Sequence, residues 1–237
     1  MVEHAAARPI SGLYVAADGG ANFAGSTTAS GGVTRVGTQT GPLGLGAVGW
    51  GFGNGLRAEI EGSIRSNDID AIDTLRLNGL RLPLGHVTGH LQTEAGMANL
   101  AYDLPLRGFI KPYVIAGIGY GDLDFRHATG DDFGVRLPLP SGNRFTGPVV
   151  VHLGSAGAFA YQAGFGLAAA VPGLRALDAT IEYRYFGTAH ADVPITRTAA
   201  NTTDLINGAV PSSRTHNRFT LGDNALMVGL RYSFGAL

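Results

Sequence analysis

The most constraining feature of the sequence is a stretch in which apolar and polar residues alternate without a break. From Leu56 to Arg65, Leu, Ala, Ile, Gly and Ile occupy every second position, and Arg, Glu, Glu, Ser and Arg occupy the positions between them. This period of two predicts a β-strand with one apolar and one charged face. Such a strand belongs in a sheet that has an apolar environment on one face and a polar environment on the other.

The same period recurs along the chain and predicts eight strands. Residues 177–188 and 221–234 repeat it most clearly. In the segments rich in glycine and alanine, Asp18, Lys111 and Gln162 mark the polar face. The predicted strands are Gly12–Phe23, Leu43–Phe52, Leu56–Arg65, Gln92–Asp103, Ile110–Leu123, Ala156–Ala168, Leu177–Thr188 and Leu221–Phe234.

The fourth predicted strand contains a conflict. Glu94 and Asn99 have opposite parity in the sequence, so a regular strand places them on opposite faces. Both are polar, and only one face of the neighbouring strands is polar. One of the two residues therefore breaks the alternation unless a β-bulge intervenes.

Short and long connections alternate strictly between these strands. The short ones cover 53–55, 104–108 and 171–174, and the first contains the Asn-Gly sequence typical of tight turns. The long ones cover 24–42, 66–91, 124–155 and 189–220. A compact soluble domain seldom keeps four long loops at one end. Barrels of bacterial outer membranes, in contrast, combine short periplasmic turns with long external loops.

Composition narrows the options further. The 237 residues include no cysteine, which excludes disulfides, thiolate catalysis and cysteine-ligated metal sites. The net charge of -1 gives no reason to expect a nucleic-acid partner. Only 15% of the residues are charged, which is low for a soluble surface, yet no run of 18 apolar residues is present for a membrane helix. A β-barrel is therefore the membrane-spanning structure that this sequence still permits.

Alternation alone does not say which face points outward, because a soluble ligand-binding barrel has the same period with its apolar face inside. Aromatic residues at the strand ends favour the membrane interpretation, since they fall on the short-turn side, where an interfacial girdle belongs. The girdle residues are Trp50, Phe52, Tyr102, Tyr232 and Phe234. The residues predicted to face lipid are Ile60, Ile64, Ile181, Tyr183, Leu226, Val228 and Leu230.

The opposite face carries charges of both signs, five acidic and five basic. They are Asp18, Arg57, Glu59, Glu61, Arg65, Lys111, Asp178, Glu182, Arg184 and Arg231. Because an eight-stranded barrel is only wide enough for its own side chains, we expect a neutral network of salt bridges that plugs the lumen. The alternative is a gated, narrow ion path through the same network.

Six short segments are informative as an ordered set. They are Gly12–Val15, Arg57–Gly62, Met97–Asp103, Lys111–Val114, Ile181–Phe186 and Val228–Phe234. Together they resemble the strands of the small outer-membrane β-barrels of the OmpA-like and opacity-protein superfamily, and the resemblance covers nearly the whole chain. It implies an all-β fold, an eight-stranded antiparallel transmembrane up-and-down β-barrel with short periplasmic turns and four long external loops.

The end of the chain departs from this family. The last segment looks like the closing strand that the barrel-assembly machinery recognises, but Gly235-Ala236-Leu237 follow its terminal aromatic residue. We expect no periplasmic peptidoglycan-binding domain after the barrel, so the cell-wall anchoring of longer family members is not implied. The first residues lack a signal-peptide pattern, so any export signal was removed or replaced before this numbering begins.

The long connections hold six of the seven histidines. These are His86, His90, His127, His152, His190 and His216, with Asp122, Asp124, Asp131 and Asp132 nearby. A metal site or a pH-responsive cluster would need several of them to converge. Histidines on polar loops are usually solvated, and Pro83 and Gly85 oppose a helix at His86 and His90. We therefore predict no metal site and no cofactor.

Two local residue pairs are the only candidates for catalysis at the outer rim. Ser155 lies near His152 in the sequence, and Asp192 lies near His190. Neither pair forms a known motif, and proximity in sequence is not geometry. We therefore expect no enzymatic activity.

These observations predict a single domain over residues 1–237, with an N-terminal segment of residues 1–11 and a barrel of about residues 12–234. We expect an outer-membrane protein with a structural or surface-interaction role. Its expected partners are outer-membrane lipid, the barrel-assembly machinery during insertion and a protein bound through the external loops. The competing hypotheses are a small-solute pore, a lipid-modifying enzyme at the outer rim and a soluble ligand-binding barrel.

Overall fold

Eight long strands form the body of the protein. The computed structural model describes residues 9–24, 28–30, 36–72, 75–77, 80–82, 87–106, 108–130, 137–138, 144–145, 149–174, 176–199 and 213–236. The long strands are β1 (Ser11–Ala24), β4 (Gly41–Phe52), β5 (Leu56–Ile72), β8 (Val87–Asp103), β9 (Ile110–Gly130), β13 (Ser155–Ala170), β14 (Leu177–Thr188) and β17 (Gly222–Ser233).

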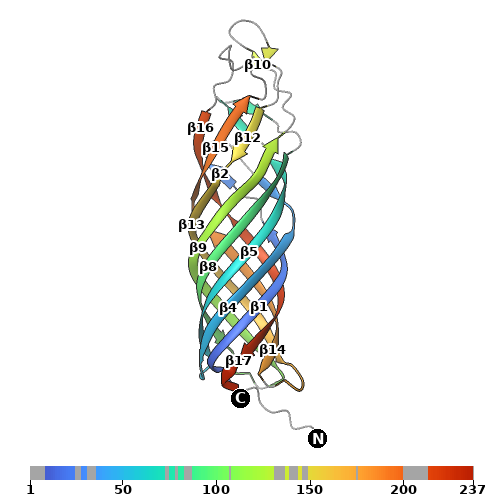
Figure 1. Ribbon diagram of the computed structural model, residues 1–237, viewed down its shortest axis with the longest axis vertical. Coiled ribbons are helices and arrows are strands. Elements are labelled where there is room, and N and C mark those ends of the chain that lie inside the picture. Colours follow the sequence, from blue (N-terminus) through green and yellow to red (C-terminus); the bar gives the residue numbers. More distant parts are fainter. Residues whose placement is uncertain are drawn as a thin grey trace.

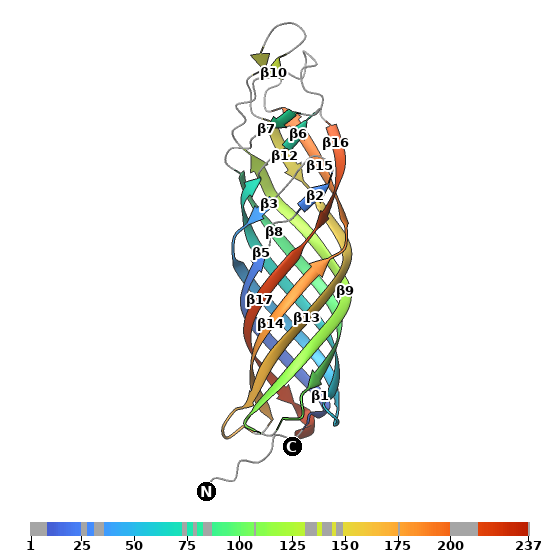
Figure 2. The same ribbon diagram turned by 180° about the vertical axis from the view of Figure 1, so that it is seen from behind.

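The strands close into an up-and-down barrel (Figures 1 and 2). Each long strand pairs antiparallel with its neighbours in the sequence, and β17 pairs back with β1. The three short turns, the start of β1 and the end of β17 lie at one end of the barrel, which we call the turn end; the opposite end is the loop end. A short 3-10 helix, η1 (Phe234–Ala236), follows β17 at the turn end. No helix among the described residues is long and apolar enough to cross a membrane.

Shorter strands lie toward the loop end. One group forms a four-stranded sheet in the order β12-β15-β16-β2, and two small two-stranded sheets pair β6 with β7 and β10 with β11. Strand β3 pairs with β5. Their bounds are β2 (Thr28–Ser30), β3 (Val36–Thr38), β6 (Leu75–Leu77), β7 (Leu80–Leu82), β10 (Leu137–Pro138), β11 (Arg144–Phe145), β12 (Val149–Leu153), β15 (Ala191–Ala199) and β16 (Ser213–Thr220).

The strand register fixes the shape of the barrel. Starting at Tyr14 and stepping through the paired residues once around the barrel leads to Asp223 and then to Ala24, ten residues further along β1. This stagger requires strands that tilt by about 40° to the barrel axis. An eight-stranded barrel of this kind has an interior that its own side chains can fill.

The first turn shows why the chain reverses so tightly. Gly53 and Gly55 adopt φ values of 78° and 93°, a region that residues with a side chain rarely enter. Between them, the Asn54 side chain accepts a hydrogen bond from the backbone N–H of Leu56 at 3.0 Å. The turn thereby joins β4 to β5 in three residues.

Glycines within the strands are covered by tyrosine rings. Tyr14 lies directly opposite Gly49, and Tyr161 directly opposite Gly187. A Cβ placed on Gly49 would come within 2.3 Å of the Tyr14 ring, so the ring occupies the space that a side chain would take. Such aromatic cover offsets the poor packing of glycine in a sheet, which helps a chain with 37 glycines to form long strands.

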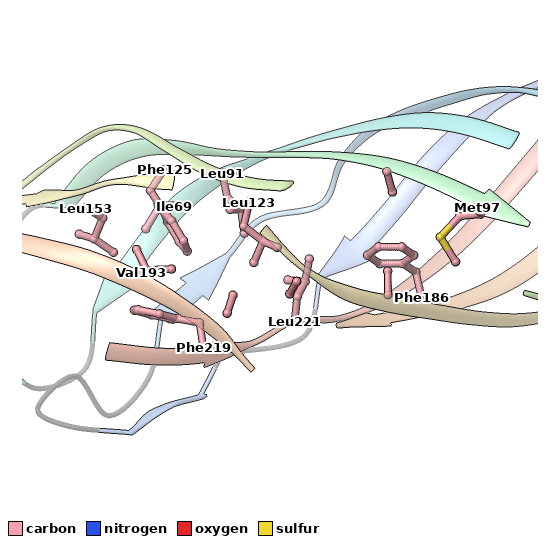
Figure 3. Packing of buried hydrophobic residues seen from close by; sticks show 14 residues of the cluster. Ile69, Leu91, Met97, Leu123, Phe125, Leu153, Phe186, Val193, Phe219 and Leu221 are labelled. Atoms are coloured by element: carbon pink, nitrogen blue, oxygen red, sulfur yellow. The ribbon is translucent and has the colours of Figure 1, made fainter. Parts of the chain in front are cut away.

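The loop end of the barrel has an apolar core (Figure 3). Its side chains come from β5, β8, β9, β12, β13, β14, β15 and β16 and from Leu221, which follows β16, and they point toward one another inside the wall. A smaller apolar cluster lies on the inner wall between β4 and β17. The larger core contains Ile69, Leu91, Ala95, Met97, Leu123, Phe125, Leu153, Ala158, Ala160, Phe186, Ala191, Val193, Phe219 and Leu221.

Three strands are longer than the sequence predicted, and the long connections are correspondingly shorter. Strand β5 continues from Arg65 to Ile72, β8 begins at Val87 and β9 runs to Gly130. The reason is a reversal of the pattern: beyond this level Asp68 and Asp70 point outward while Ile69 is buried inside. The alternation that places apolar residues on the outer face therefore ends at this level, although each strand continues toward the loop end.

Candidate functional site: the barrel lumen

The ten charged residues assigned to the inner face all lie on the inside of the wall. Asp18 and Lys111 are half-buried, and the other eight are at most 9% exposed. They sit on β1, β5, β9, β14 and β17, so each strand brings its charges into the same narrow space. Because the lumen holds both signs, the charges can neutralise one another there.

The layer nearest the turn end centres on Arg57. Its Nη2 lies 3.1 Å from Asp103 Oδ1, and its Nη1 donates to the Tyr14 hydroxyl at 3.2 Å. Tyr14 in turn donates to Glu59 Oε2 at 2.5 Å. The guanidinium also lies over the Tyr113 ring, 5.2 Å from its centroid. Arg57 is thus held by a carboxylate, a hydroxyl and aromatic faces.

A second ion pair completes this layer. Arg231 Nη2 donates to Asp178 Oδ2 at 3.0 Å, and Lys111 Nζ lies 3.9 Å from the same oxygen. The Arg231 guanidinium also faces the Tyr113 ring at 5.6 Å. Tyr113 therefore lies between the two arginines of the layer.

The middle layer centres on Arg184. Its guanidinium pairs with both Glu61 and Glu182, and Nε donates to Glu182 Oε1 at 2.5 Å. The amide of Asn99 donates to Glu61 Oε2 at 2.9 Å and to Glu59 Oε1 at 3.1 Å. One arginine and one amide thereby hold three carboxylates in the centre of the barrel.

Further polar side chains extend the middle layer across the lumen. Gln162 donates to Asn99 Oδ1 at 2.7 Å, and Tyr113 donates to Glu182 Oε2 at 2.8 Å. The Thr180 hydroxyl donates to Asp18 Oδ1 at 2.7 Å. The network therefore links β1, β5, β8, β9, β13 and β14.

The layer nearest the loop end centres on Arg65, which is 1% exposed. Its guanidinium stacks 4.0 Å from the centroid of the Phe186 ring, and Nη1 donates to Ser63 Oγ at 2.9 Å. Beside it, Asn22 donates to Asn67 at 3.0 Å and to Asp223 at 3.2 Å. Phe186 belongs to the apolar core, so the polar and apolar parts of the interior meet at Arg65.

Sequence reasoning missed several members of this network. They share the inward parity of residues that it did identify, and this parity is the signal that would have found them. Tyr14 lies on the same face as Asp18, and Asp223 on the same face as Arg231. The missed residues are Tyr14, Asn22, Asn67, Asp103, Tyr113 and Asp223.

The structure resolves the conflict in the fourth predicted strand. Asn99 points into the lumen and is 3% exposed, whereas Glu94 is exposed on the outside. The register between β5 and β8 runs regularly through both residues, without a bulge. Glu94 is therefore the residue that breaks the alternation, and Gln92 donates to its Oε1 at 2.7 Å.

The outer face of the barrel carries an apolar band, which we call the belt. All seven residues assigned to lipid are exposed, from 37% for Tyr183 to 74% for Ile60. On β9 the apolar outward residues run from Ile110 to Tyr120, and the next outward residue is Asp122. Ten steps of about 3.3 Å at a tilt of about 40° span about 25 Å of the barrel axis, which is the height of an outer-membrane belt.

Aromatic side chains border the belt at both ends. Of the girdle residues, Trp50, Phe52, Tyr102 and Phe234 are at least 40% exposed, while Tyr232 is half-buried with its ring 5.0 Å from that of Phe234. A second row lies toward the loop end, where the sequence analysis named none. This row contains Phe23, Tyr120, Phe159, Tyr161 and Tyr185.

The histidine candidates remain dispersed. His90, His190 and His216 are exposed, and His90 Nε2 lies 3.5 Å from Asp68 Oδ1. His127 lies in β9 and His152 in β12. His86, Asp131 and Asp132 fall outside the described residues. In the part of the chain that the structure describes, no three His, Asp or Glu residues are grouped for a metal ion.

The two residue pairs considered for catalysis lie at the loop end. Ser155 begins β13, and His152 belongs to β12. His190 precedes β15, and the carboxylate of Asp192 forms an exposed ion pair with Arg218 at 3.5 Å. The carboxylate of Asp192 is therefore engaged by an arginine.

Polar side chains inside and an apolar belt outside define a closed transmembrane β-barrel, and they exclude the soluble barrel, whose apolar face would be the core. The chain belongs to the outer membrane protein beta-barrel domain family, whose model matches residues 1–234. It is an outer membrane protein, in agreement with the resemblance noted in the sequence.

A curated relative and two solved structures are similar to this chain. A curated outer membrane protein of Gluconacetobacter diazotrophicus is 32% identical over 243 residues, covering 95% of this chain and 58% of that protein. The chain thus spans a little over half the length of this relative. A major outer membrane protein of Thermus thermophilus has the same fold, with a TM-score of 0.52, 12% identity and coverage of 93% of this chain and 98% of that one. Neisserial surface protein A matches with a TM-score of 0.48, 17% identity and coverage of 94% and 98%.

Proposed function

We propose that this protein is an outer-membrane barrel with a closed lumen, whose role is structural or interactive rather than transporting. The observation that carries the proposal is the hydrogen-bonded network of charges around Arg57 and Arg184. It crosses the lumen at the level of the belt and links six of the eight strands. Ions would have to break these contacts to pass.

The energetics of the network favour closure. Arg184 is 3% exposed and pairs with two carboxylates that are themselves at most 5% exposed. Removing one partner of a buried ion pair leaves an uncompensated charge, which costs about 3–5 kcal/mol. A gate that opens by separating Arg184 from its carboxylates would meet a barrier of this kind.

The apolar core at the loop end supports closure by a second means. Leu123 and Phe219 are fully buried there, and the Phe125 and Phe219 rings lie 5.3 Å apart. An ion entering from the loop end would have to shed its water among apolar side chains, which is unfavourable. The proposed plug therefore has a polar part and an apolar part in series.

The proposed interactions follow from the same geometry. The belt would contact outer-membrane lipid, and β17 would be the closing strand that the barrel-assembly machinery handles during insertion. Beyond the belt, the outer wall is polar, with Asp68, Asp70 and Asp192 exposed to water. A protein partner would be recognised on this surface and on the external loops.

Single-channel recording tests the closed lumen directly. The refolded protein, shown to be folded by different mobility in SDS with and without boiling, is added to a planar lipid bilayer. We expect insertion without steady conductance. Stable, reproducible openings of the unmodified protein would contradict the proposal and favour the pore.

The pore remains the second candidate because some buried polar atoms have no protein partner. Nε and Nη2 of Arg65, Oδ1 of Asp223 and Oε1 of Gln162 form no hydrogen bond with the described residues. Water molecules between these atoms would start a path through the polar layers. If the lumen conducts, Arg65→Met should change the conductance or the ion selectivity of the pore. If the lumen is closed, neither the unmodified protein nor the Arg65→Met variant should carry a current.

A lipid-modifying enzyme at the rim is tested separately. The proposal predicts no hydrolysis of labelled lipid A by the folded protein in vesicles. Hydrolysis that is lost on changing His152 or His190 to alanine would replace the proposed role with a catalytic one.

A further inference from the structure

The barrel closes where its first and last long strands, β1 and β17, meet. Their pairing runs from Tyr14 and Ser233 near the turn end to Ala24 and Asp223 toward the loop end, and we call it the seam. A turn or a loop of the chain joins the two strands of every other neighbouring pair, whereas β1 and β17 are the first and the last in the sequence. Backbone pairing and side-chain contacts alone therefore keep the seam closed.

Side-chain hydrogen bonds also join strands that are not neighbours, and they do so over glycines. Gly166 on β13 pairs with Tyr113 on one side and with Glu182 on the other. The Tyr113 hydroxyl donates to Glu182 Oε2 at 2.8 Å, and a Cβ on Gly166 would come within 2.4 Å of the Tyr113 ring. Tyr14 on β1 reaches Glu59 on β5 in the same way over a glycine of β4. A glycine in the middle strand thus lets the two flanking strands contact each other on the inner wall.

One of these contacts crosses the seam. Gly229 on β17 pairs with Asp18 on β1 and with Thr180 on β14, which runs beside β17 (Figure 2). The Thr180 hydroxyl donates to Asp18 Oδ1 at 2.7 Å. A Cβ on Gly229 would come within 1.9 Å of this oxygen, so the carboxylate lies directly over the last strand. Asp18 and Thr180 therefore hold β17 between them from the inside of the barrel.

Small residues occupy the inward positions on either side of Asp18. Ala16 and Gly20 share its parity and have no polar side-chain atoms. A second side-chain hydrogen bond crosses the seam nearer the loop end, from Asn22 to Asp223 at 3.2 Å. If β1 moved away from β17, the Asp18 carboxylate would lose its hydroxyl donor. Leaving a half-buried donor and acceptor without this bond is unfavourable, so the contact opposes opening of the seam.

We propose that Asp18 and Thr180 form a latch over Gly229 that keeps the seam closed. The latch needs β17 in its place, because its two side chains come from the strands on either side of β17. It therefore forms only when the last strand has joined the first, and it opposes their separation afterwards. The latch acts on the wall of the barrel and not on the lumen, so it is independent of whether the lumen conducts.

Unfolding in SDS tests the latch, because the folded barrel and the unfolded chain differ in mobility. Thr180→Val removes the hydroxyl and keeps the shape of the side chain. At a fixed raised temperature, we expect this variant to lose its folded band about tenfold faster than the unmodified protein, the effect of one hydrogen bond to a carboxylate. Thr180→Ser, which keeps the donor, should restore most of the slow rate.

A disulfide across the seam shows whether the effect is local. The chain has no cysteine, and Ala17 and Leu230 lie directly opposite each other with both side chains on the outer face. Opposite residues of neighbouring strands are close enough for a disulfide, so Ala17→Cys and Leu230→Cys together close the seam covalently. The temperature is raised until this oxidised parent unfolds at a measurable rate. Adding Thr180→Val should then no longer accelerate unfolding, and the acceleration should return on reduction.

Tyr113→Phe is the matched control, because it removes a hydroxyl that donates to Glu182 over Gly166, away from the seam. It should change the unfolding rate by the same factor in the oxidised and the reduced protein. Each variant is first shown to be folded by its mobility in SDS before and after boiling.

An acceleration by Thr180→Val that persists in the oxidised protein would overturn the proposal, since the contact would then add to general stability without acting at the seam. A Tyr113→Phe effect that also vanishes on oxidation would overturn it too, because the action would not be local. So would an acceleration by Thr180→Val of less than about twofold in the reduced protein, which is below the range of a single hydrogen bond.

Discussion

The two halves of the barrel have opposite construction. At the level of the belt, Ile60 and Ile181 point outward and Glu61 and Glu182 point inward. Toward the loop end, Asp70 on β5 points outward and Leu123 on β9 points inward. The backbone pairing is the same in both halves. The two halves differ in the polarity of both faces, and the outer face of each half matches its surroundings, lipid around the belt and water beyond it.

This comparison shows that the sheet tolerates either polarity inside. Each half requires an outer face that matches its solvent and an inner face whose side chains satisfy one another without solvent. A polar interior is complete when its charges are paired, and an apolar interior is complete when it is closely packed. The two halves should therefore fail for different reasons when they are mutated.

The largest effect is expected in the polar half. Replacing Arg184 by methionine leaves Glu61 and Glu182 buried without their cation, and we expect a loss of about 3–5 kcal/mol in the free energy of unfolding. Urea titration of the protein folded in lipid vesicles measures this. Changing both carboxylates to glutamine in the same protein should restore part of the stability. A loss below about 1 kcal/mol, within the range of exposed pairs, would show that water compensates the charges.

In the apolar half, the corresponding change is Leu123→Ala. Leu123 is fully buried in the core, so the substitution should leave a cavity and cost about 2–5 kcal/mol. The matched control is Ile118→Ala on the same strand, where the side chain is 59% exposed in the belt. Lipid tails can fill the space left by Ile118, so its loss should be smaller. Equal losses would mean that the loop-end core is not closely packed.

The outer faces can be compared with one substitution in each half. An arginine at Ile181 faces acyl chains and should cost about 2–4 kcal/mol. An arginine at Asp70 faces water at the loop end and should change stability by less than about 0.5 kcal/mol. Folding yield and urea midpoint in vesicles measure both. If I181R and D70R fold equally well, the belt has been placed wrongly.

The sequence predicted the belt-level half well because its pattern is the simplest. Leu177–Thr188 was predicted with the bounds that β14 has, and the inward parity of Arg57, Glu59 and Glu61 follows directly from alternation. The fold class and the family follow from the same alternation and from the rhythm of short and long connections.

The loop-end half was not predicted, for a physical reason. At Ile69 and Leu123 the apolar residues change from the outer to the inner face, so a search for apolar-outward strands ends there although the hydrogen bonding continues. The partners in each ion pair could not be predicted from the sequence either. Parity places Arg184 inside, but only the barrel's stagger brings it to Glu61, 123 residues away in the sequence.

The smallest effect is expected on the outer wall of the loop end. Asp192 and Arg218 form an ion pair at 3.5 Å with both side chains about two-thirds exposed, at 64% and 66%. Water and salt screen such a pair, so Asp192→Asn should cost less than about 1 kcal/mol, and the cost should fall further at high salt. The same type of ionic contact is thus expected to matter severalfold more around Arg184 than here. A loss for D192N as large as that for R184M would mean that this surface is covered rather than solvated, and that a partner or an external loop packs against it.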